Sequence, residues 1–410
     1  MIDDMRTMTL SEELIYRGMH AQNTIGDIKE LDKSEGRKFY LGVDPSQKSM
    51  TIGNLAALMM AKVFIRHGYE PFLLVGGATG QIGDPKMDKE RSKQSVKQIA
   101  NNSLGIKSQF ERIMNEDNVH MVSNLAWFKD IKYIDFLNEI GTQFSMTQLL
   151  DRDFVKSRIG EGGSGISYAE FSYSLIQGYD YLWLYRNHGI TLQLCGADQY
   201  GNSASGMHLI KRLEGKKVDV WSLPLILDGN GKKFGKSEGN AIWLDKDLTS
   251  VFDFYQFWLN VDDEGVERYI KIYTEINPEE IDEILNLHRK NPSARGAQKA
   301  LALGTTEVVH GRELAVNAAH ITNVLFGDND IKDLKKDGLK LLEETIPVVK
   351  KGINIVDALI NTQLASSKSD AQRLINSKAI SVNGEKVSDN QKVSELSIIK
   401  KGKNQFILVR

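Results

Sequence analysis

The segment from residue 44 to residue 54 has the composition of a nucleotide-binding turn. It reads DPSQKSMTIGN, follows a short apolar run, and ends where a helical pattern begins. The unpaired N–H groups and the positive dipole end of such a helix attract phosphate or ribose oxygens. A glycine at position 53 would let a nucleotide approach the backbone closely. We therefore expect a binding site for a nucleotide at Gly53.

A second polar segment carries two lysines around a glycine. It reads KFGKS from Lys233 to Ser237 and lies in a polar stretch, residues 228–240. Lysines at this spacing could stabilise the negative charge of a leaving pyrophosphate. On its own the pattern is more typical of a solvent-exposed lysine loop, so its interpretation depends on the rest of the chain.

A third group of polar residues shares one face of a predicted helix. Ser167 and Glu170 have the spacing of a capping box, which begins a helix. On that helix Tyr173, Gln177 and Asp180 follow at i, i+4 and i+7 and so lie on one face. Because their neighbours are largely apolar, this face suits a pocket that holds both ends of a zwitterionic amino acid better than it suits a solvated surface.

Strand and helix patterns place these segments in an α/β domain. Apolar runs at 38–43, 71–75, 119–123 and 191–196 predict strands, and helical patterns lie between them. This alternation is typical of a parallel sheet whose ligands bind at the carboxyl ends of the strands. We predict a Rossmann-like, doubly wound catalytic domain over residues 1–228.

The remainder of the chain divides into smaller parts. Residues 229–326 hold the KFGKS segment and then mainly helices, the charged stretch 327–349 is predicted to be a linker, and residues 350–410 are predicted to form a small α+β module with a hairpin at Asn383–Gly384. The module has eleven Lys and Arg against five Asp and Glu, a balance of +6, so residues 1–349 carry −8. A basic module joined to an acidic body favours contact with phosphates.

The composition excludes several classes of protein. With 410 residues, 41 % hydrophobic and 26 % charged, the chain is neither disordered nor fibrous, and its net charge of −2 argues against a uniformly basic nucleic-acid-binding surface. The single cysteine, Cys195, cannot form an intramolecular disulfide, and no Cys/His cluster has zinc-ligand spacing. The N-terminus lacks the apolar core of a secretory signal, and no segment is long and apolar enough to span a bilayer. We expect a cytoplasmic protein without a metal site of its own or a membrane contact.

Two glycine patterns raise an alternative, a nicotinamide-dependent oxidoreductase. Residues 77–83 read GATGQIG after a predicted strand, and residues 160–165 match G-x-G-x-x-G by letters. Asp84 and Pro85 directly follow the first pattern, where a dinucleotide-binding helix would continue, and no strand pattern precedes the second. Both patterns therefore fit loops better than a dinucleotide site.

TIGN and KFGKS together resemble HIGH and KMSKS, the two signature motifs of class I aminoacyl-tRNA synthetases. Further blocks narrow the resemblance to bacterial-type tyrosyl-tRNA synthetases and cover nearly the whole chain: YLGVDPS (40–46), VGGATGQIGDP (75–85), ISYAEFSYSLIQGYD (166–180), LCGADQYGN (194–202) and KFGKSEGNAIWL (233–244). The tail resembles the alpha-L-motif RNA-binding module that ends these enzymes. The resemblance implies a ligase that makes tyrosyl-adenylate and pyrophosphate from L-tyrosine and ATP, with Mg²⁺ accompanying ATP, and then transfers tyrosine to the 3′ end of tRNA(Tyr).

The resemblance also implies roles for residues of this chain. Those that would hold tyrosine are Tyr40 and Asp180 at the phenol, Tyr173, Gln177 and Asp84 at the α-ammonium group, and Gln193 and Gln199 near the carboxylate. Those that would hold ATP are Asp44, Gly53, Asn54, Asp198 and Lys236. Those that would act on the phosphates are Lys233, Lys236, Thr51 and Ser46. The family further implies a homodimer. The candidates for its interface are apolar residues between about 120 and 160, although such residues more often form core. They are Trp127, Phe128, Phe136, Leu137 and Phe144.

One position departs from the family motif. Thr51 stands where HIGH begins with histidine, and Asn54 stands where it ends with histidine. A threonine hydroxyl can still donate a hydrogen bond, but it has a shorter reach and cannot carry charge. Two alternatives therefore stay open: a paralogue that binds RNA without charging it, and a tryptophan-specific relative, against which the phenol partners Tyr40 and Asp180 argue.

Overall fold

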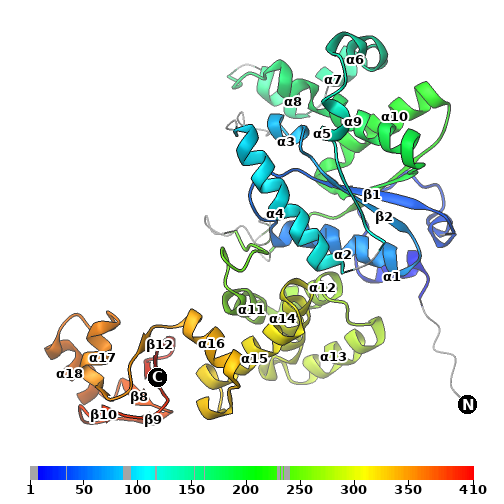
Figure 1. Cartoon of the computed structure of the whole chain (residues 1–410). Helices are drawn as coiled ribbons and strands as arrows, with labels where there is room; N and C mark the ends of the chain where they lie inside the picture. Colours follow the sequence, from blue (N-terminus) through cyan, green and yellow to red (C-terminus); the bar gives the residue numbers. More distant parts are fainter. Residues whose placement is uncertain are drawn as a thin grey trace, which may run out of the picture. The chain divides into compact units, whose positions relative to one another are not determined.

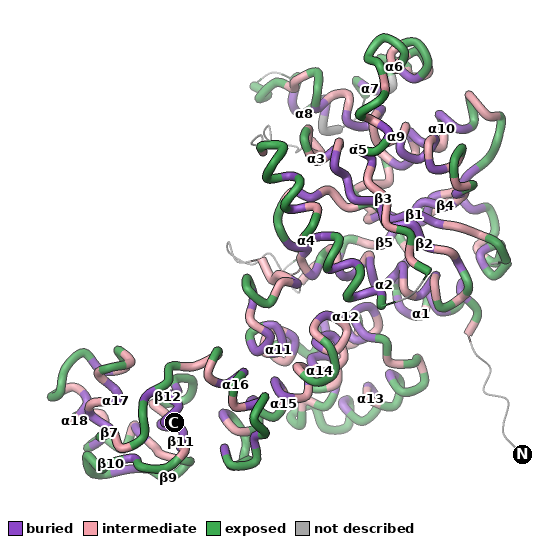
Figure 2. Tube along the Cα trace, in the orientation of Figure 1, coloured by how far each residue is buried: buried purple, intermediate pink, exposed green. Residues whose placement is uncertain are grey.

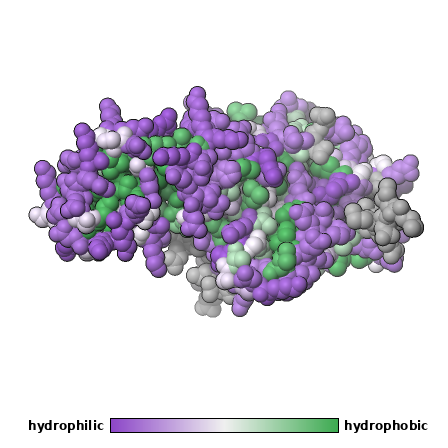
Figure 3. Space-filling view, turned by 90° about the horizontal axis from the view of Figure 1, so that it is seen from below, coloured by the Kyte–Doolittle hydropathy of each residue, from purple (hydrophilic) through white to green (hydrophobic). Residues whose placement is uncertain are grey.

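Two units make up the chain in the computed structural model, which describes residues 8–33, 35–85, 94–115, 118–151, 153–160, 162–228, 231, 234 and 241–410 (Figure 1). The first unit comprises Met1–Leu248 and Val261–Ala297, and the second comprises Thr249–Asn260 and Gln298–Arg410. None of the helices in the described ranges is both long and apolar enough to cross a bilayer. On the face drawn in Figure 3, hydrophilic side chains cover most of the surface.

A five-stranded parallel sheet forms the centre of the first unit. Its strands are β1 (Lys38–Val43), β2 (Glu70–Val75), β3 (His120–Ser123), β4 (Leu192–Gly196) and β5 (Asp219–Leu223), in the order β3-β2-β1-β4-β5. All neighbouring strands run parallel. The order reverses between β1 and β4, and the carboxyl ends of these two strands form the crevice in which open α/β sheets bind ligands. The predicted doubly wound sheet is confirmed.

Helices cover both faces of this sheet. Figure 1 shows α2 (Ile52–Arg66) on one side and α9 (Tyr168–His188) and α10 (Tyr200–Glu214) on the other. The long helix α4 (Val96–Met114) packs against α2 and β2, and Figure 2 shows that the strands are mostly buried whereas α4 has an exposed side. The remaining helices of this unit are α1 (Leu10–Tyr16), α3 (Thr79–Ile82), α5 (Leu125–Phe128), α6 (Tyr133–Glu139), α7 (Met146–Leu150), α8 (Asp153–Ile159), α12 (Asp263–Tyr273) and α13 (Pro278–Lys290).

The second unit contains helices followed by a small α+β module. The helices are α11 (Val251–Leu259), α14 (Gly296–His310), α15 (Arg312–Phe326) and α16 (Lys336–Thr345). The module contains α17 (Ile355–Asn361), α18 (Lys368–Asn376), β6 (Val348–Val349), β7 (Ile353–Asn354), β8 (Ile380–Val382), β9 (Glu385–Lys386), β10 (Lys392–Val393), β11 (Ser397–Lys401) and β12 (Gln405–Val409). Five of these strands form a sheet in the order β6-β12-β11-β8-β9 over a core of their own. The predicted hairpin is confirmed, because β8 and β9 pair antiparallel around Asn383 and Gly384, which both have positive φ.

The unit boundaries differ from the predicted ones in two places. Residues 261–297 belong to the first unit, although they follow the predicted boundary at residue 228. The stretch 327–349, expected to be a linker, contains α16 and the first strand of the module. This stretch is rich in lysine, but it also contains an apolar helical pattern: Leu334, Leu341 and Leu342 are buried.

Candidate active site

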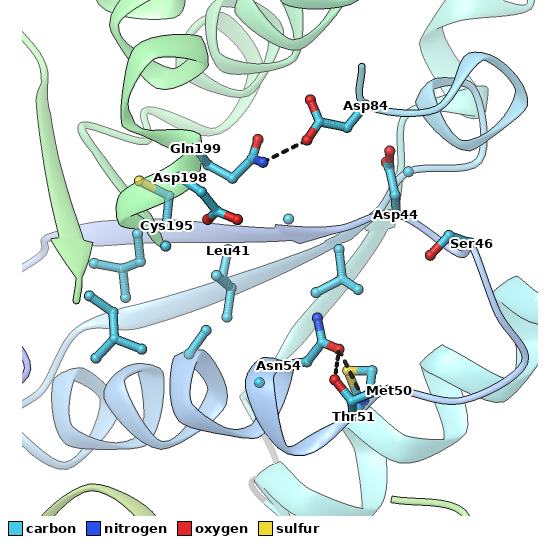
Figure 4. Close-up of a pocket in the computed structure, with 18 of the residues that line it drawn as sticks. Leu41, Asp44, Ser46, Met50, Thr51, Asn54, Asp84, Cys195, Asp198 and Gln199 are labelled. Carbon is cyan, nitrogen blue, oxygen red and sulfur yellow. Dashed lines mark hydrogen bonds between the residues drawn. The ribbon is translucent and has the colours of Figure 1, made fainter. Parts of the chain in front are cut away.

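A cavity of about 610 Å³ lies at the carboxyl ends of β1 and β4. It is lined by the end of β1 and the following turn, the N-terminus of α2, one face of α9, and β4 with the turn after it (Figure 4). The residues predicted from the sequence that line it are Tyr40, Asp44, Ser46, Thr51, Gly53, Asn54, Asp84, Tyr173, Gln177, Asp180, Gln193, Asp198 and Gln199. Lys233 and Lys236 lie outside the described residues.

A buried carboxyl group and a buried phenol hydroxyl meet at one part of the cavity. Tyr40 on β1 and Asp180 on α9 are each 1 % exposed. Asp180 accepts hydrogen bonds from Asn124 Nδ2 at 3.1 Å and from Trp127 Nε1 at 2.9 Å. Burial raises the pKa of Asp180 to about 8 in spite of these two bonds. The carboxyl group of the free protein therefore keeps its proton over most of the neutral range.

Three buried polar atoms in this cavity have no hydrogen-bond partner within the described part of the chain. They are the Tyr40 hydroxyl, Gln177 Oε1 and Gln193 Oε1. Tyr40 and Gln193 are direct neighbours in the register of β1 and β4. Buried polar atoms in folded proteins are nearly always hydrogen-bonded, so three such atoms together indicate the position of a polar ligand.

Asp44 joins the turn after β1 to two other elements. Tyr173 donates a hydrogen bond to Asp44 Oδ2 at 2.8 Å, and Thr79 donates to Oδ1 at 2.6 Å. Burial, followed by the charge of Asp44, raises the pKa of Tyr173, which keeps its hydroxyl a donor. A side chain on Gly76 would overlap Asp44 Oδ1, so this contact requires a glycine at the end of β2.

Asp84 is held by amide side chains from the turn after β4 and from the first turn of α10. Gln199 Nε2 donates to Asp84 Oδ2 at 2.8 Å, as Figure 4 shows, and Asn202 Nδ2 lies 3.3 Å from Oδ1. The loop after residues 77–83 thereby meets the turn after β4. Asp84 follows a glycine pattern that serves no dinucleotide site here, since the short helix α3 ends at Ile82.

The N-terminus of α2 faces the cavity with Thr51 as its N-cap. The Thr51 N–H and hydroxyl both donate to Asn54 Oδ1, at 3.0 and 3.2 Å, and Figure 4 shows these bonds. Gly53 and Asp198 are exposed and reach the cavity from α2 and from the turn after β4. The Thr51 hydroxyl, expected to meet a phosphate, donates to Asn54 in this structure.

The predicted capping box of α9 is only half formed. Ser167 accepts a hydrogen bond from the Glu170 N–H at 3.3 Å, and α9 begins at Tyr168 as expected. The Glu170 carboxylate instead pairs with Arg158 at 3.1 Å, and both side chains are 2 % exposed. The ion pair takes the place of the reciprocal cap because α8 brings an arginine within reach.

Sequence reasoning missed four residues that support the site: Thr79, Asn124, Trp127 and Asn202. Asn124 directly follows β3 and Thr79 follows β2 after three small residues, and a polar residue in the turn after a strand was the signal that could have found them. Trp127 was expected as an interface candidate, but it is 5 % exposed and its indole N–H is used by Asp180. Within the described ranges, no three His, Cys, Asp or Glu side chains group as metal ligands.

Comparisons with known proteins place this site in a family. The family described as "tRNA synthetases class I (W and Y)" matches residues 33–327, and the "Tyrosine--tRNA ligase SYY-like C-terminal domain" matches residues 338–410. The tyrosine–tRNA ligase of Lactococcus lactis (strain MG1363) is 39 % identical over 422 residues, and that of Streptococcus gordonii is 37 % identical over 420 residues; each alignment covers 98 % of this chain and 100 % of the relative. The chain belongs to the class I tyrosine–tRNA ligases.

Solved structures of tyrosyl-tRNA synthetases share this fold. The C-terminally truncated mitochondrial enzyme of Coccidioides posadasii gives a TM-score of 0.68 at 30 % identity, covering 78 % of this chain and 93 % of that one. The corresponding Aspergillus nidulans enzyme gives 0.71 at 28 % identity, covering 79 % and 96 %. Membership of the tyrosine–tRNA ligases confirms the resemblance drawn from the motifs and removes the oxidoreductase and the tryptophan-specific alternatives.

Proposed function

We propose that the cavity binds L-tyrosine with its phenol group between Tyr40 and Asp180. The observation that carries this proposal is the buried Tyr40 hydroxyl, which has no partner in the described part of the chain and lies in the same cavity as the Asp180 carboxyl group. A phenol oxygen can accept a hydrogen bond from Tyr40 and donate one to Asp180. Phenylalanine would leave the Tyr40 hydroxyl buried and unpaired and would set an apolar ring edge against the buried Asp180 carboxyl group, which disfavours it.

The polar groups on the other walls suit the charged end of the amino acid. Tyr173, Gln177 and Asp84 would hold the α-ammonium group, and Gln193 and Gln199 would orient the carboxylate. Asp44, which the family resemblance implies for ATP, also orients Tyr173 through their 2.8 Å hydrogen bond. We therefore assign Asp44 a place between the two substrates.

ATP would lie across the N-terminus of α2. Gly53, Asn54, Asp44 and Asp198 would hold the nucleoside, while Ser46, Thr51, Lys233 and Lys236 would meet the phosphates. A carboxylate oxygen of tyrosine attacks the α-phosphorus, and the bond from that phosphorus to the pyrophosphate oxygen breaks. No side chain acts as nucleophile, so positioning and charge stabilisation supply the rate. Mg²⁺ would enter with ATP and be held largely by phosphates and water.

Transfer of tyrosine requires tRNA(Tyr), and the basic module is its proposed contact. Residues 350–410 carry a balance of +6 and fold around a core of their own. Binding of RNA phosphates to this surface would weaken as salt rises. Following the family resemblance, we place the protein in the cytoplasm.

A homodimer is proposed from the family resemblance, and the large apolar side chains that are exposed between residues 125 and 168 are candidates for its interface. They are Leu125, Tyr133, Ile134, Met146, Leu150, Ile159 and Tyr168. Tyr133 and Ile134 are each 62 % exposed, which is unfavourable unless another protein surface covers them. Sedimentation should give twice the 46.0 kDa chain mass, and a fully active monomer at micromolar concentration would contradict the dimer.

Tyrosine-dependent exchange of pyrophosphate into ATP tests the proposed function. The full-length protein should exchange, while Lys233→Ala and Lys236→Ala variants should lose most of the rate with their folds intact. Exchange no greater than in these variants would favour the alternative raised by Thr51, a paralogue that binds RNA without charging it.

A further inference from the structure

We propose that Gln109 on α4 is a positioning residue for adenylate formation. Through Ser49, its side chain joins the turn that precedes α2 to the segment 242–245. The inference rests on the proposal that ATP binds across the N-terminus of α2. Gln109 does not line the cavity, whereas Ser49 and Met50 do. Gln109 therefore acts on the site only through the backbone that it holds.

Both ends of the Gln109 amide are used by consecutive residues of the turn. Its Oε1 accepts from the Met50 N–H at 2.8 Å, and its Nε2 donates to Ser49 Oγ at 2.9 Å. Ser49 Oγ donates to the Met50 carbonyl at 2.8 Å and accepts from the Asp245 N–H at 3.1 Å. Gln109 and Ser49 are each 4 % exposed. A buried polar pair of this kind fixes the direction of each backbone group that it binds, because leaving any of them unpaired is costly.

Other residues on the same face of α4 contact earlier positions of the turn. Asn102 Nδ2 donates to the Pro45 carbonyl at 3.0 Å. One turn further along the helix, a side chain on Gly105 would overlap the carbonyl oxygen of Lys48. Positions 102, 105 and 109 have the i, i+3, i+7 spacing of one helix face. Helix α4 therefore supports the turn along its length from Pro45 to Met50.

The segment after the KFGKS motif is bound to the same turn. Ile52 N–H donates to the Ile242 carbonyl at 3.2 Å, and the Leu244 N–H donates to the Met50 carbonyl at 2.9 Å. Thr51 and Trp243 form an antiparallel bridge. Arg112, three residues after Gln109 on α4, donates to the Leu244 carbonyl at 2.9 Å. Both sides of this junction line the cavity, through Thr51 and Trp243.

Adenylate formation depends on the geometry of the contacts between the turn before α2 and the segment 242–245. The α-phosphorus must meet the tyrosine carboxylate in line, and a displacement of about 1 Å in such a geometry can cost about 100-fold in rate. The Met50 backbone lies one residue before the cap of α2 and holds Leu244, so a change in its direction would move both segments. A leucine or methionine at position 109 would fill the core equally well but would fix neither Met50 nor Ser49.

Gln109→Met in the full-length protein tests the inference. Pre-steady-state adenylate formation should slow by about 10- to 100-fold, with a weaker apparent affinity for ATP and tyrosine affinity within about twofold of wild type. Ser49→Ala should act in the same direction. The double variant should lose no more than the more damaging single change, because the two residues work through one hydrogen bond.

Two matched variants separate positioning from general destabilisation. Gln298→Met removes a buried glutamine amide on α14 that does not line the cavity, and should leave adenylate formation unchanged. Gly105→Ala removes no hydrogen bond but displaces the Lys48 carbonyl, and it should slow the same step as Gln109→Met.

Two results would overturn the inference. One is folded Gln109→Met that forms adenylate at the wild-type rate, and the other is an equal loss of tyrosine and ATP binding. Wild-type protein without exchange activity would instead count against the proposed function itself.

Discussion

Replacing Asp180 with asparagine removes a buried acid from the proposed phenol end of the tyrosine pocket while keeping the size of the side chain. Burial raises the pKa of Asp180 to about 8, although Asn124 and Trp127 donate hydrogen bonds to it. A bound phenol would add a third donor, and this donor favours the ionised carboxylate. Tyrosine should therefore bind the ionised form better than the protonated form.

The size of the effect follows from that pKa. With a pKa of about 8, about 1 % of the free protein has ionised Asp180 at pH 6 and about 10 % at pH 7. The kcat/KM for tyrosine should therefore rise steeply between pH 6 and pH 8 and flatten above, because this parameter reports the free enzyme. A hydrogen bond to a charged acceptor contributes roughly 1.5–3 kcal/mol, so Asp180→Asn should lower the plateau by about 10- to 150-fold.

The assay is pyrophosphate exchange with tyrosine and with phenylalanine, across pH 6 to 8.5. In Asp180→Asn the rise with pH should vanish for tyrosine, and kcat/KM for phenylalanine should stay level or increase, since a buried acid no longer faces the edge of its ring. The KM for ATP should not change. The matched control is Asp247→Asn, an exposed acid in the first unit that does not line the cavity.

Equal losses for tyrosine and phenylalanine would refute this reasoning. So would a pH profile of Asp180→Asn that follows the wild-type rise, because another group would then be titrating.

The remaining predictions concern the nucleotide side, the basic module and the packing of α1. Thr51→Val should slow adenylate formation with little change in tyrosine affinity, whereas Thr51→His should keep or raise the rate; a wild-type rate in the valine variant, measured before steady state, would show that the hydroxyl adds nothing to the chemistry. Deleting the chain from Pro347, which removes the whole module, should leave pyrophosphate exchange intact and impair aminoacylation, and normal charging by the truncated protein would assign the module another role. Burial alone would raise the pKa of Glu13, but hydrogen bonds from His67 and Arg17 and the charge of Arg66 lower it to about 2. The stability that Glu13 contributes is thus fully present above its unfolded pKa of 4.5 and is lost as pH falls through its folded pKa of about 2. The melting temperature of Glu13→Gln should therefore lie below wild type at pH 7, approach it below pH 4.5 and meet it only near pH 2; a constant difference would contradict this.

Much of the scaffold could be predicted because the parallel sheet has a local signature. Apolar runs followed by polar turns located four strands to within one residue, and the turns after them carry the residues of the cavity. The i, i+4, i+7 spacing alone brought Tyr173, Gln177 and Asp180 to one wall.

The rest depends on contacts between distant segments. Asp180 accepts a hydrogen bond from the Trp127 indole N–H, and Glu170 pairs with Arg158 rather than with its own helix cap. Both contacts depend on which elements pack together, which the local sequence pattern does not specify. The helix in the stretch 327–349 was missed because its lysines outweighed the buried leucines in the composition. The Thr51 hydroxyl was expected to be available to a ligand, but the motif residue Asn54, three positions away, accepts its hydrogen bond.

The sheet of the basic module has a consequence for synthesis of the chain. Strand β12, at residues 405–409, lies between β6 and β11, and Phe406 to Val409 are buried. The strand that begins the module therefore pairs with the strand that ends it, so the sheet cannot close until Val409 has left the ribosome. The first unit ends more than a hundred residues earlier and can fold while translation continues. Translation that ends early, before the last strand is made, would therefore release a folded first unit whose proposed RNA-binding module cannot close.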